Sequence, residues 1–228
     1  MNEPYAIEVS DLHRTYHTGK LEVHALRGVD LQVKTGRFVA VKGRSGSGKT
    51  TLLNCIGGLD QPTQGSVYVH GQNIFDLRER ARTRWRREQV GFVFQSFGLL
   101  PTLSAYENVE LILRMSGMGY KERRQTALKA LGMVGLEKWV NHRPPEMSGG
   151  QQQRVAIARA IINSPQVILA DEPTAELDSG TAREILTLFK EISQNEGITV
   201  LMVSHDGLVD EYVEQILTLK SGILSEAG

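Results

Sequence analysis

The residues at positions 43–50 have the types and the spacing of a loop that binds phosphate. They read GRSGSGKT and match the pattern G-x-x-x-x-G-K-[ST]. The glycines let successive backbone N–H groups approach an anion, Lys49 is expected to reach the β- and γ-phosphates of a nucleotide, and Thr50 offers its hydroxyl to Mg²⁺. The residues predicted to bind the nucleotide here are Gly43, Arg44, Ser45, Gly46, Ser47, Gly48, Lys49, Thr50 and Thr51.

Apolar segments on both sides of this loop predict the strand and the helix that the pattern requires. Residues 38–41 (FVAV) predict a buried strand, and residues 51–56 (TLLNCI) predict the start of a helix. The alternative is an ordinary Gly/Ser turn between two elements, which these flanks disfavour.

Two acidic residues follow a second predicted buried strand, at 167–170 (VILA). Open α/β sheets bind their ligands at the carboxyl ends of such strands. Asp171 there suits Mg²⁺, directly or through water, and Glu172 is placed to orient or deprotonate the water that attacks the γ-phosphate. His205 follows a third such strand, 199–203 (TVLMV), in the same kind of position. The alternative for the two acids is a polar loop without chemistry.

A second glycine-rich loop precedes the helix predicted over residues 152–162. Ser148, Gly149 and Gly150 are followed there by Gln151. The backbone N–H groups at a helix N-terminus bind anions, although an ordinary helix cap is the alternative. Two phosphate-shaped loops far apart in one sequence suggest that a nucleotide is contacted from two sides.

Two further features each have two interpretations. Tyr16, upstream of the phosphate loop, either packs in the core or stacks on an adenine ring. The stretch at 77–89 is either a patch for nucleic acid or anionic lipid, or a solvated helix with Trp85 packed inward. Glu79, Glu88 and the neutral total charge favour the solvated helix. The arginines of this stretch are Arg78, Arg80, Arg82, Arg84, Arg86 and Arg87.

The composition fits one large domain or a domain with a subdomain. The chain has 228 residues with 26 basic and 26 acidic side chains, so its charge does not call for nucleic acid as a partner. The lone Cys55 excludes an internal disulfide and suits a packed thiol in a reducing compartment. Residues 1–4 lack the features of a signal peptide, and no apolar run approaches the roughly 20 residues of a membrane span.

The remaining elements are predicted from alternating and periodic patterns. Residues 7–9 and 29–33 alternate apolar and polar side chains and predict half-buried antiparallel strands. Ser104 and Glu107 have the form of a capping box at the start of a helix that runs to position 115. Strands are also expected at 66–70 and 90–94, and helices at 121–131 and 181–194.

Together these motifs resemble those of the ATP-binding subunits of ABC transporters, over residues 5–222. The phosphate loop is similar to the Walker A motif, and Asp171 and Glu172 are similar to the Walker B aspartate and the catalytic glutamate. Further matches are Tyr16 with the A-loop aromatic residue, Gln95 with the Q-loop glutamine, and Ser148, Gly149, Gly150 and Gln151 with the signature motif, in which Met147 replaces the usual Leu. Asp178 matches the end of the D-loop and His205 the switch histidine.

The resemblance implies an ATPase with an α/β P-loop fold in one domain at 1–228. That fold has a mixed central sheet, an N-terminal antiparallel β-subdomain and an inserted helical subdomain at about 97–163. It also implies ATP and Mg²⁺ as cofactors. The metal would be held by Thr50, Gln95 and Asp171. The catalytic residues would be Lys49, Glu172 as the base, and His205 as a residue that stabilises the γ-phosphate in the transition state.

The resemblance further implies a head-to-tail dimer, most simply of two identical copies. Each ATP would lie between the Walker A loop of one subunit and the signature loop of the other. The helical segment would dock a short coupling helix of an integral-membrane permease and so hold the chain at the cytoplasmic face of the membrane. Nucleic acid is not expected as a partner.

Three stretches resemble the lipoprotein-releasing and macrolide-exporter type of subunit, at residues 22–29, 54–60 and 91–103. Two rival interpretations are a regulatory ATP-binding subunit of a cell-division-type membrane complex and a soluble ABC ATPase without a transport role. Two residues depart from the family pattern. Arg44 replaces a frequent Pro, and Glu176 in the D-loop replaces a small or amide residue near the expected dimer seam. Neither departure removes a catalytic group.

Overall fold

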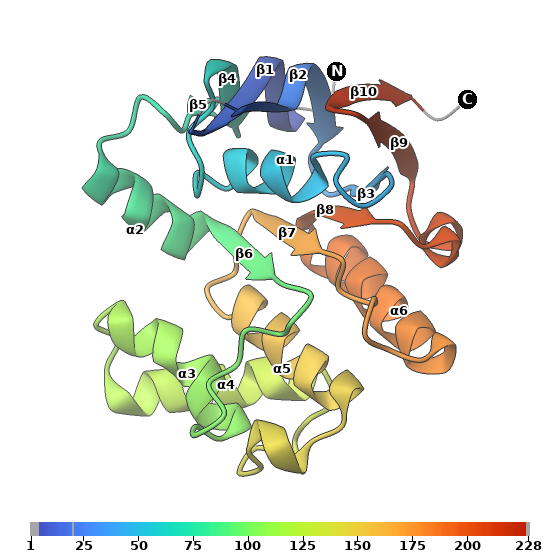
Figure 1. Cartoon of the computed structure of the whole chain (residues 1–228). Coiled ribbons are helices and arrows are strands. Elements are labelled where there is room, and N and C mark those ends of the chain that lie inside the picture. The colour runs from blue at the N-terminus through green and yellow to red at the C-terminus, as the bar shows by residue number, and fades with distance from the viewer. Residues whose placement is uncertain (1–4, 20, 227–228) are drawn as a thin grey trace.

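The computed structural model describes residues 5–19 and 21–226, and residues 1–4, over which no signal peptide is predicted, lie outside that part (Figure 1). The strands are β1 (Tyr5–Thr18), β2 (Leu21–Lys34), β3 (Phe38–Lys42), β4 (Gln64–Val69), β5 (Gln72–Asn73), β6 (Val90–Val93), β7 (Val167–Asp171), β8 (Thr199–Ser204), β9 (Gln215–Lys220) and β10 (Ile223–Glu226). The helices are α1 (Lys49–Ile56), α2 (Glu79–Gln89), α3 (Ala105–Met115), α4 (Tyr120–Met133), α5 (Gly149–Ile161) and α6 (Ser179–Glu196), with short 3-10 helices η1 (Pro144–Glu146) and η2 (Gly207–Glu211).

The larger sheet is mixed, as the family resemblance implies. Its order is β10-β9-β3-β8-β7-β6, and only the pairing of β10 with β9 is antiparallel. Parallel strands share a carboxyl edge, so the segments that follow β3, β7 and β8 emerge side by side. This edge brings the phosphate loop, Asp171 with Glu172, and His205 together. The strands β9 and β10 were not predicted.

The smaller sheet is antiparallel, with the order β2-β1-β4-β5. The predicted pairing of residues 7–9 with 29–33 is confirmed, since Ile7 lies opposite Val33 and Val9 opposite Leu31. Both strands continue well beyond the predicted segments and place Tyr16 opposite Val23. Several register shifts interrupt the pairing, and they break the period-2 pattern from which the extension would have been predicted.

Side chains alternate between the two faces of the larger sheet and supply two cores. Phe38 and Ala40 of β3 belong to a cluster covered by helices α3 to α6. Val39 and Val41 belong to a cluster covered by α1 and the smaller sheet (Figure 1). Cys55 is buried in the second cluster, and burial raises the pKa of its thiol to about 12. The predicted packed thiol is thus confirmed.

The helices α3, α4 and α5 pack on one another below β6 (Figure 1) and share the first core with the sheet. The predicted capping box of α3 is confirmed. The backbone N–H of Glu107 donates to the Ser104 hydroxyl at 3.2 Å, and that of Ser104 donates to the Glu107 carboxylate at 2.8 Å. This cap fixes where α3 begins and therefore where its apolar face meets the core.

The arginine-rich stretch forms α2 in the arrangement of a solvated helix. Trp85 is buried against the second core, and Glu79 pairs with both Arg82 and Arg86. No helix within residues 5–19 and 21–226 is both long and apolar enough to cross a membrane.

Candidate nucleotide-binding site

The phosphate loop wraps around the N-terminus of α1. Gly48 precedes the helix with a φ of 105°, in the left-handed region. A Cβ at this position would lie 2.4 Å from the carbonyl oxygen of Ala25 in β2, so only glycine fits. The loop therefore presents the first N–H groups of α1, with the positive end of the helix dipole, to its own concave side.

Lys49 is folded back into this loop and its side chain is only 7% exposed. The ammonium donates to the carbonyl oxygens of Gly43 at 2.7 Å and Arg44 at 3.2 Å, and it pairs with Oε1 of Glu172 at 3.2 Å. These contacts satisfy a buried cation that has three donors. To bind a phosphate group, the Lys49 ammonium must replace at least one of these three contacts with a contact to a phosphate oxygen.

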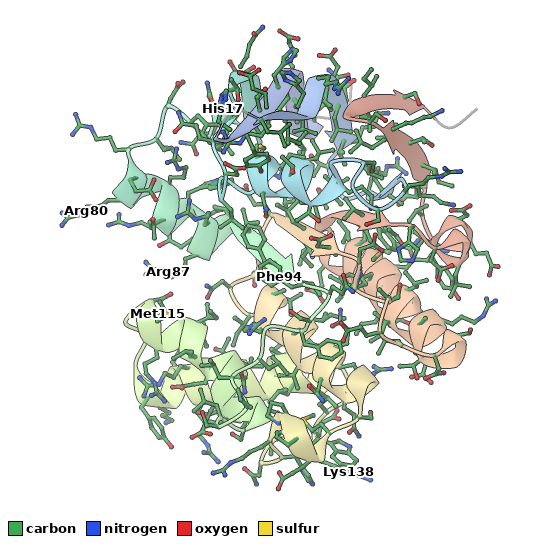
Figure 2. The ribbon with its side chains drawn as sticks, in the orientation of Figure 1. His17, Arg80, Arg87, Phe94, Met115 and Lys138 are labelled. Atoms are coloured by element: carbon green, nitrogen blue, oxygen red, sulfur yellow. The ribbon has the colours of Figure 1, made fainter. Side chains whose placement is uncertain are left out.

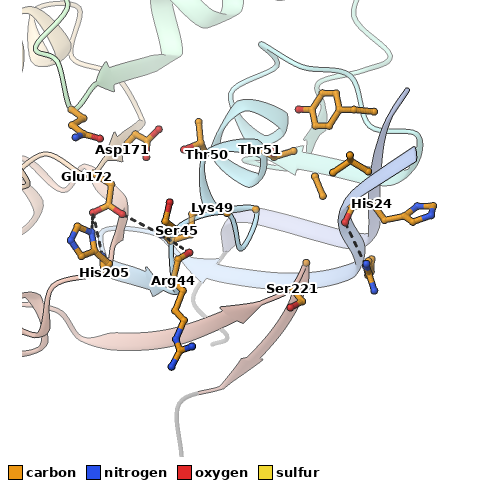
Figure 3. Close-up of a pocket in the computed structure, with 18 of the residues that line it drawn as sticks. His24, Arg44, Ser45, Lys49, Thr50, Thr51, Asp171, Glu172, His205 and Ser221 are labelled. Atoms are coloured by element: carbon orange, nitrogen blue, oxygen red, sulfur yellow. Dashed lines mark hydrogen bonds and ion pairs between the residues drawn. The ribbon is translucent and has the colours of Figure 1, made fainter. Parts of the chain in front are cut away.

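Glu172 lies between Lys49 and His205 (Figure 3). Its Oε2 is 2.8 Å from the ring Nδ1 of His205 and accepts the backbone N–H of His205 at 3.2 Å, while its Oε1 faces Lys49. Glu172 has a φ of 47°, which is unusual for a residue with a side chain. Such strain is common where a side chain must be aimed at a reaction centre. Both carboxylate oxygens are thus engaged within the site.

Asp171 and Thr50 form the part of the site that suits a metal ion. Burial raises the pKa of Asp171, a hydrogen bond with Thr50 opposes this rise, and the charge of Glu172 adds to it. Oδ1 of Asp171 is buried without a hydrogen-bond partner among the described residues. A buried carboxylate oxygen that still needs a partner, next to a hydroxyl at a phosphate loop, is a donor set that Mg²⁺ uses. The residues here fit the predicted metal.

A cavity of about 1140 Å³ brings most of the predicted residues together (Figure 3). They arrive from β1, from the phosphate loop and from the ends of β6, β7 and β8. The predicted residues that line it are Tyr16, Arg44, Ser45, Gly46, Gly48, Lys49, Thr50, Thr51, Gln95, Asp171, Glu172 and His205. Gly43 and Ser47 lie behind this surface, where Gly43 accepts from Lys49 and Ser47 is buried.

Tyr16 lines the cavity and belongs to neither hydrophobic core, so the core-packing interpretation is wrong. Its hydroxyl donates to Asp60, and the Arg14 guanidinium lies over its ring. Val23, which pairs with Tyr16 across the hairpin, also lines the cavity, as do Ser221 and Gly222. Sequence reasoning missed these residues because it did not predict the outer half of the hairpin or β9 and β10.

The second glycine-rich loop lies elsewhere, at the N-terminus of α5. The backbone N–H of Gln151 donates to the Ser148 hydroxyl at 3.3 Å, and that of Ser148 donates to the Gln151 side chain at 2.9 Å. A Cβ on Gly150 would lie 2.4 Å from the Thr181 methyl group, so this glycine lets α5 approach α6 closely. None of Ser148, Gly149, Gly150 and Gln151 lines the cavity described above.

The segment at 175–178 packs against this second loop. A Cβ on Gly149 would lie 3.3 Å from the Leu177 side chain and 4.0 Å from the Glu176 carbonyl oxygen. Asp178 caps α6, because its carboxylate accepts from the N–H groups of Gly180 and Thr181 at 3.0 and 3.1 Å. The hydrogen bonds from the Thr181 hydroxyl and backbone lower the pKa of Asp178. The side chain of Glu176 is exposed.

A separate groove of about 430 Å³ lies between α2, β6 and α3. Phe94, Leu100 and Met115 line it and are 38%, 47% and 63% exposed. Arg86, Arg87 and Arg159 also line it, and the residues that line it include no acid. Figure 2 labels three of these residues, which are Arg87 in α2, Phe94 just after β6 and Met115 at the end of α3. Gln95 follows Phe94 in the chain and lines the large cavity instead, so the two hollows adjoin.

The chain is similar to proteins of one family over nearly its full length. Residues 26–175 match the family described as "ABC transporter". The chain is 48% identical over 220 residues to the uncharacterized ABC transporter ATP-binding protein MJ0796 of Methanocaldococcus jannaschii, which covers 95% of this chain and 94% of that protein. It is 44% identical over 220 residues to the macrolide export ATP-binding/permease protein MacB of Syntrophobacter fumaroxidans, and this match covers 96% of this chain but 31% of that protein. The chain therefore spans about a third of the length of that relative.

Solved structures give the same result for the fold. The structure described as the dimeric post-hydrolysis state of the ATP-binding cassette MJ0796 bound to ADP and Pi has a TM-score of 0.88 and 45% identity, and the match covers 97% of this chain and 99% of that one. The cbiO1 protein of Clostridium perfringens, described as part of the transporter complex cbiONQ, has a TM-score of 0.88 at 31% identity, with 98% and 88% of the two chains covered. The predicted α/β P-loop fold is confirmed.

Proposed function

This chain belongs to the ABC transporter family of ATP-binding proteins and is an ATPase, and we propose from that premise that two copies of it close around ATP and drive a separate membrane permease. The observation that carries this proposal is the separation of two anion-binding loops. The phosphate loop lines the cavity with Glu172, whereas the loop at Ser148 does not reach it. Two copies arranged head to tail complete both sites, because each copy supplies the second loop to its partner.

The contacts of Glu172 support its role as the base. Glu172 leaves Lys49 when the phosphates of ATP take over the Lys49 ammonium, and its freed oxygen then faces the attacking water. His205, 63% exposed at the rim of the cavity, is placed to stabilise the γ-phosphate in the transition state. Tyr16 stacks on the adenine. Mg²⁺ held by Thr50, Gln95 and Asp171 would neutralise charge on the phosphates.

Two opposite charges support pairing with an identical copy. The side chain of Arg44 extends away from Lys49 and Glu172 (Figure 3), and those of Arg44 and Glu176 are both exposed. Glu176 adjoins the loop at Gly149 that would cover the partner's phosphates. A partner's Glu176 would therefore come within reach of Arg44, and the two-fold symmetry would form this pair twice. The residues that depart from the family pattern would thus complement each other.

The apolar groove beside α2 supports a permease as the other partner. Its exposed Phe94, Leu100 and Met115 suit the apolar face of a short helix. The MacB relative is named as an ATP-binding/permease protein and is about three times as long as the matched region. We infer that the permease that works with this chain is of the lipoprotein-release or macrolide-export type and holds the chain at the cytoplasmic face of the membrane.

Partner capture from detergent-solubilised membranes tests this function. A tagged Glu172→Gln chain is expected, with ATP, to form a dimer and to retain a permease with few membrane spans and a large external domain. Leu100→Asp in the groove is expected to lose the permease, because a carboxylate replaces an apolar contact. Leu21→Asp, which changes a leucine that is 64% exposed outside the groove, is the matched control and is expected to retain it.

Other outcomes would overturn the proposal in distinguishable ways. Retention of ribosomal or DNA-bound material without a membrane protein would favour an ABC ATPase without a transport role. Retention of the permease by Leu100→Asp as strongly as by Leu21→Asp would remove the groove from the docking surface. A permease whose loss stops cell division without affecting export would favour the regulatory alternative.

A further inference from the structure

Asp60 binds the hydroxyl of Tyr16, and Arg14 lies over one face of its ring. Tyr16 lines the cavity, while Asp60 and Arg14 do not. We propose that Asp60 and Arg14 are positioning residues that fix the Tyr16 ring in the orientation that receives the adenine. This inference rests on the proposed role of Tyr16 in stacking on the base, and it assigns a function to two side chains that have none in the mechanism above.

Three contacts join these side chains into one unit. The Tyr16 hydroxyl donates to Oδ2 of Asp60 at 2.5 Å. Arg14 binds the same carboxylate at both oxygens, with Nε 3.0 Å from Oδ2 and Nη2 2.7 Å from Oδ1. The guanidinium carbon of Arg14 lies 4.4 Å from the centroid of the Tyr16 ring. Arg14 and Asp60 are 24% and 20% exposed, so water screens their interaction only in part.

Each contact restricts the ring in a different way. The cation over one face of the ring is attracted to its π-electrons and occupies that face, so a base can stack only on the other. The hydroxyl bond to Asp60 fixes the far end of the ring and stops it from swinging. An ordinary tyrosine hydroxyl is already a donor at neutral pH, and burial, followed by the bond to Asp60, raises the pKa of Tyr16 further.

Asp60 is itself anchored to the phosphate-binding helix. Its backbone N–H donates to the carbonyl oxygen of Asn54 in α1 at 3.1 Å, and the N–H of Leu59 donates to the same oxygen at 2.8 Å. A continuous set of contacts therefore runs from α1 through Asp60 to Tyr16. It sets the position of the proposed base site relative to the phosphate loop. An adenine and a triphosphate are covalently joined, so that position determines whether both can bind at once.

Loss of Asp60 would release the ring without touching the nucleotide. In Asp60→Asn the amide keeps one acceptor oxygen but loses the negative charge and the second acceptor, so it cannot bind the Tyr16 hydroxyl and both Arg14 nitrogens at once, and Arg14 is left as a partly buried cation without a counter-charge. Affinity for the base would fall, and affinity for the phosphates would not change. That separation distinguishes a positioning role from a general structural one.

The test compares the binding of ATP and of inorganic tripolyphosphate by the whole chain, measured by calorimetry with Mg²⁺. Asp60→Asn is expected to weaken ATP about tenfold, the scale of losing one base–aromatic stack, and to leave tripolyphosphate within about twofold. Arg14→Gln is expected to act in the same direction. Glu184→Gln, which breaks the surface pair with Arg154, is the matched control and is expected to change neither ligand.

A double-mutant cycle shows whether Asp60 acts through Tyr16. Tyr16→Ala alone is expected to weaken ATP relative to tripolyphosphate, and adding Asp60→Asn is expected to bring no further loss. Full additivity would overturn the positioning role, as would an equal loss of both ligands in Asp60→Asn. If Tyr16→Ala leaves the ratio of the two affinities unchanged, the proposed stacking itself fails and this inference fails with it. If only Asp60→Asn leaves the ratio unchanged, the stacking survives and the positioning role does not.

Discussion

Two helix N-termini of this molecule carry similar glycine-rich loops but differ in their surroundings. The N-terminus of α1 has the buried Lys49, with Asp171 and Glu172 beside it and His205 at the rim. The N-terminus of α5 has a neutral capping box made by Ser148 and Gln151. Both present backbone N–H groups and a positive dipole end, but only the first has charged and titratable side chains around it, of the kinds that can bind phosphate or move protons.

The difference divides the work between the two loops. The first loop has what a triphosphate and its metal require, so binding should need one copy of the chain. The second loop can only add neutral donors to an anion that is already held, so its contribution should show in turnover. Substitutions in the two loops should therefore separate binding from hydrolysis.

Among variants that still bind ATP, Glu172→Gln is expected to have the largest effect on hydrolysis. Glutamine keeps the shape of the side chain but cannot accept a proton, so the turnover rate should fall by about a hundredfold or more while ATP still binds. Phosphate release and calorimetric binding measure the two quantities. Glu191→Gln, the same change at an exposed carboxylate outside the site and the proposed seam, should leave the rate within a few-fold of the parent. Unchanged turnover in Glu172→Gln would refute the assignment of the base.

Gly149→Asp tests the second loop and should have the next largest effect. A carboxylate placed against the partner's phosphates is repelled by them, so turnover should fall at least about tenfold. Binding of ATP to one chain should not change, because this loop does not line the cavity of its own chain. Lys49→Ala should lose both binding and turnover.

A mixture of these two inactive chains sharpens the comparison. In a mixed dimer, the intact phosphate loop of the Gly149→Asp chain meets the intact second loop of the Lys49→Ala chain. One of the two sites is then complete, and equal mixing should recover roughly a quarter of the parent rate, since half of the dimers are mixed. No recovery, with dimers present, would argue against shared sites.

The same contrast explains how much of the site could be predicted from the sequence. The phosphate loop, Asp171, Glu172 and His205 were located because each follows a short apolar strand, and parallel strands bring their ends to one edge. The fold class and the capping box at Ser104 rest on equally local patterns, in which a few adjacent residues determine the structure.

What could not be predicted depends on contacts between distant segments. The approach of Val23 to Tyr16 is set by a long hairpin whose register shifts hide its alternation. The contacts of Asp60 with Arg14 join side chains 46 positions apart. The ion pair of Lys49 with Glu172 belongs to the assembled sheet edge and has no trace in either local sequence. Only three-dimensional packing specifies these relations.

Charge reversal at the proposed seam should have a smaller effect, on dimer formation rather than on chemistry. In a Glu172→Gln background with ATP, Arg44→Glu and Glu176→Arg should each weaken the dimer about tenfold, because each places like charges at both seams. Mixed together, these two variants should form a dimer as tight as the parent, since both seams are then complementary.

Sedimentation of the separate and mixed variants measures this effect. Reversals at two exposed residues outside the proposed seam, Arg80→Glu and Glu191→Arg, serve as controls and should leave the dimer unchanged. Weakening without recovery in the mixture would contradict the pairing of Arg44 with Glu176.

The smallest effects concern stability and pH, and they should have opposite signs in the two regions. Burial raises the pKa of Asp171 in the folded chain, so its ionised form costs stability. That cost is absent below the ordinary carboxyl pKa and complete once the pH exceeds the raised value. Asp171→Asn should therefore increase the melting temperature at pH 7 without nucleotide or metal, with a gain that shrinks as the pH falls toward 4.

The pKa of Asp178 is instead lowered by its hydrogen bonds at the start of α6. Its ionised form contributes stability above the ordinary pKa, which is lost as the pH falls through the lowered value. Asp178→Ala should thus decrease the melting temperature at pH 7 and lose this effect in acid. Thermal unfolding of both variants from pH 3 to 8 measures the difference, and a decrease at neutral pH in both would show that Asp171 stabilises the empty site.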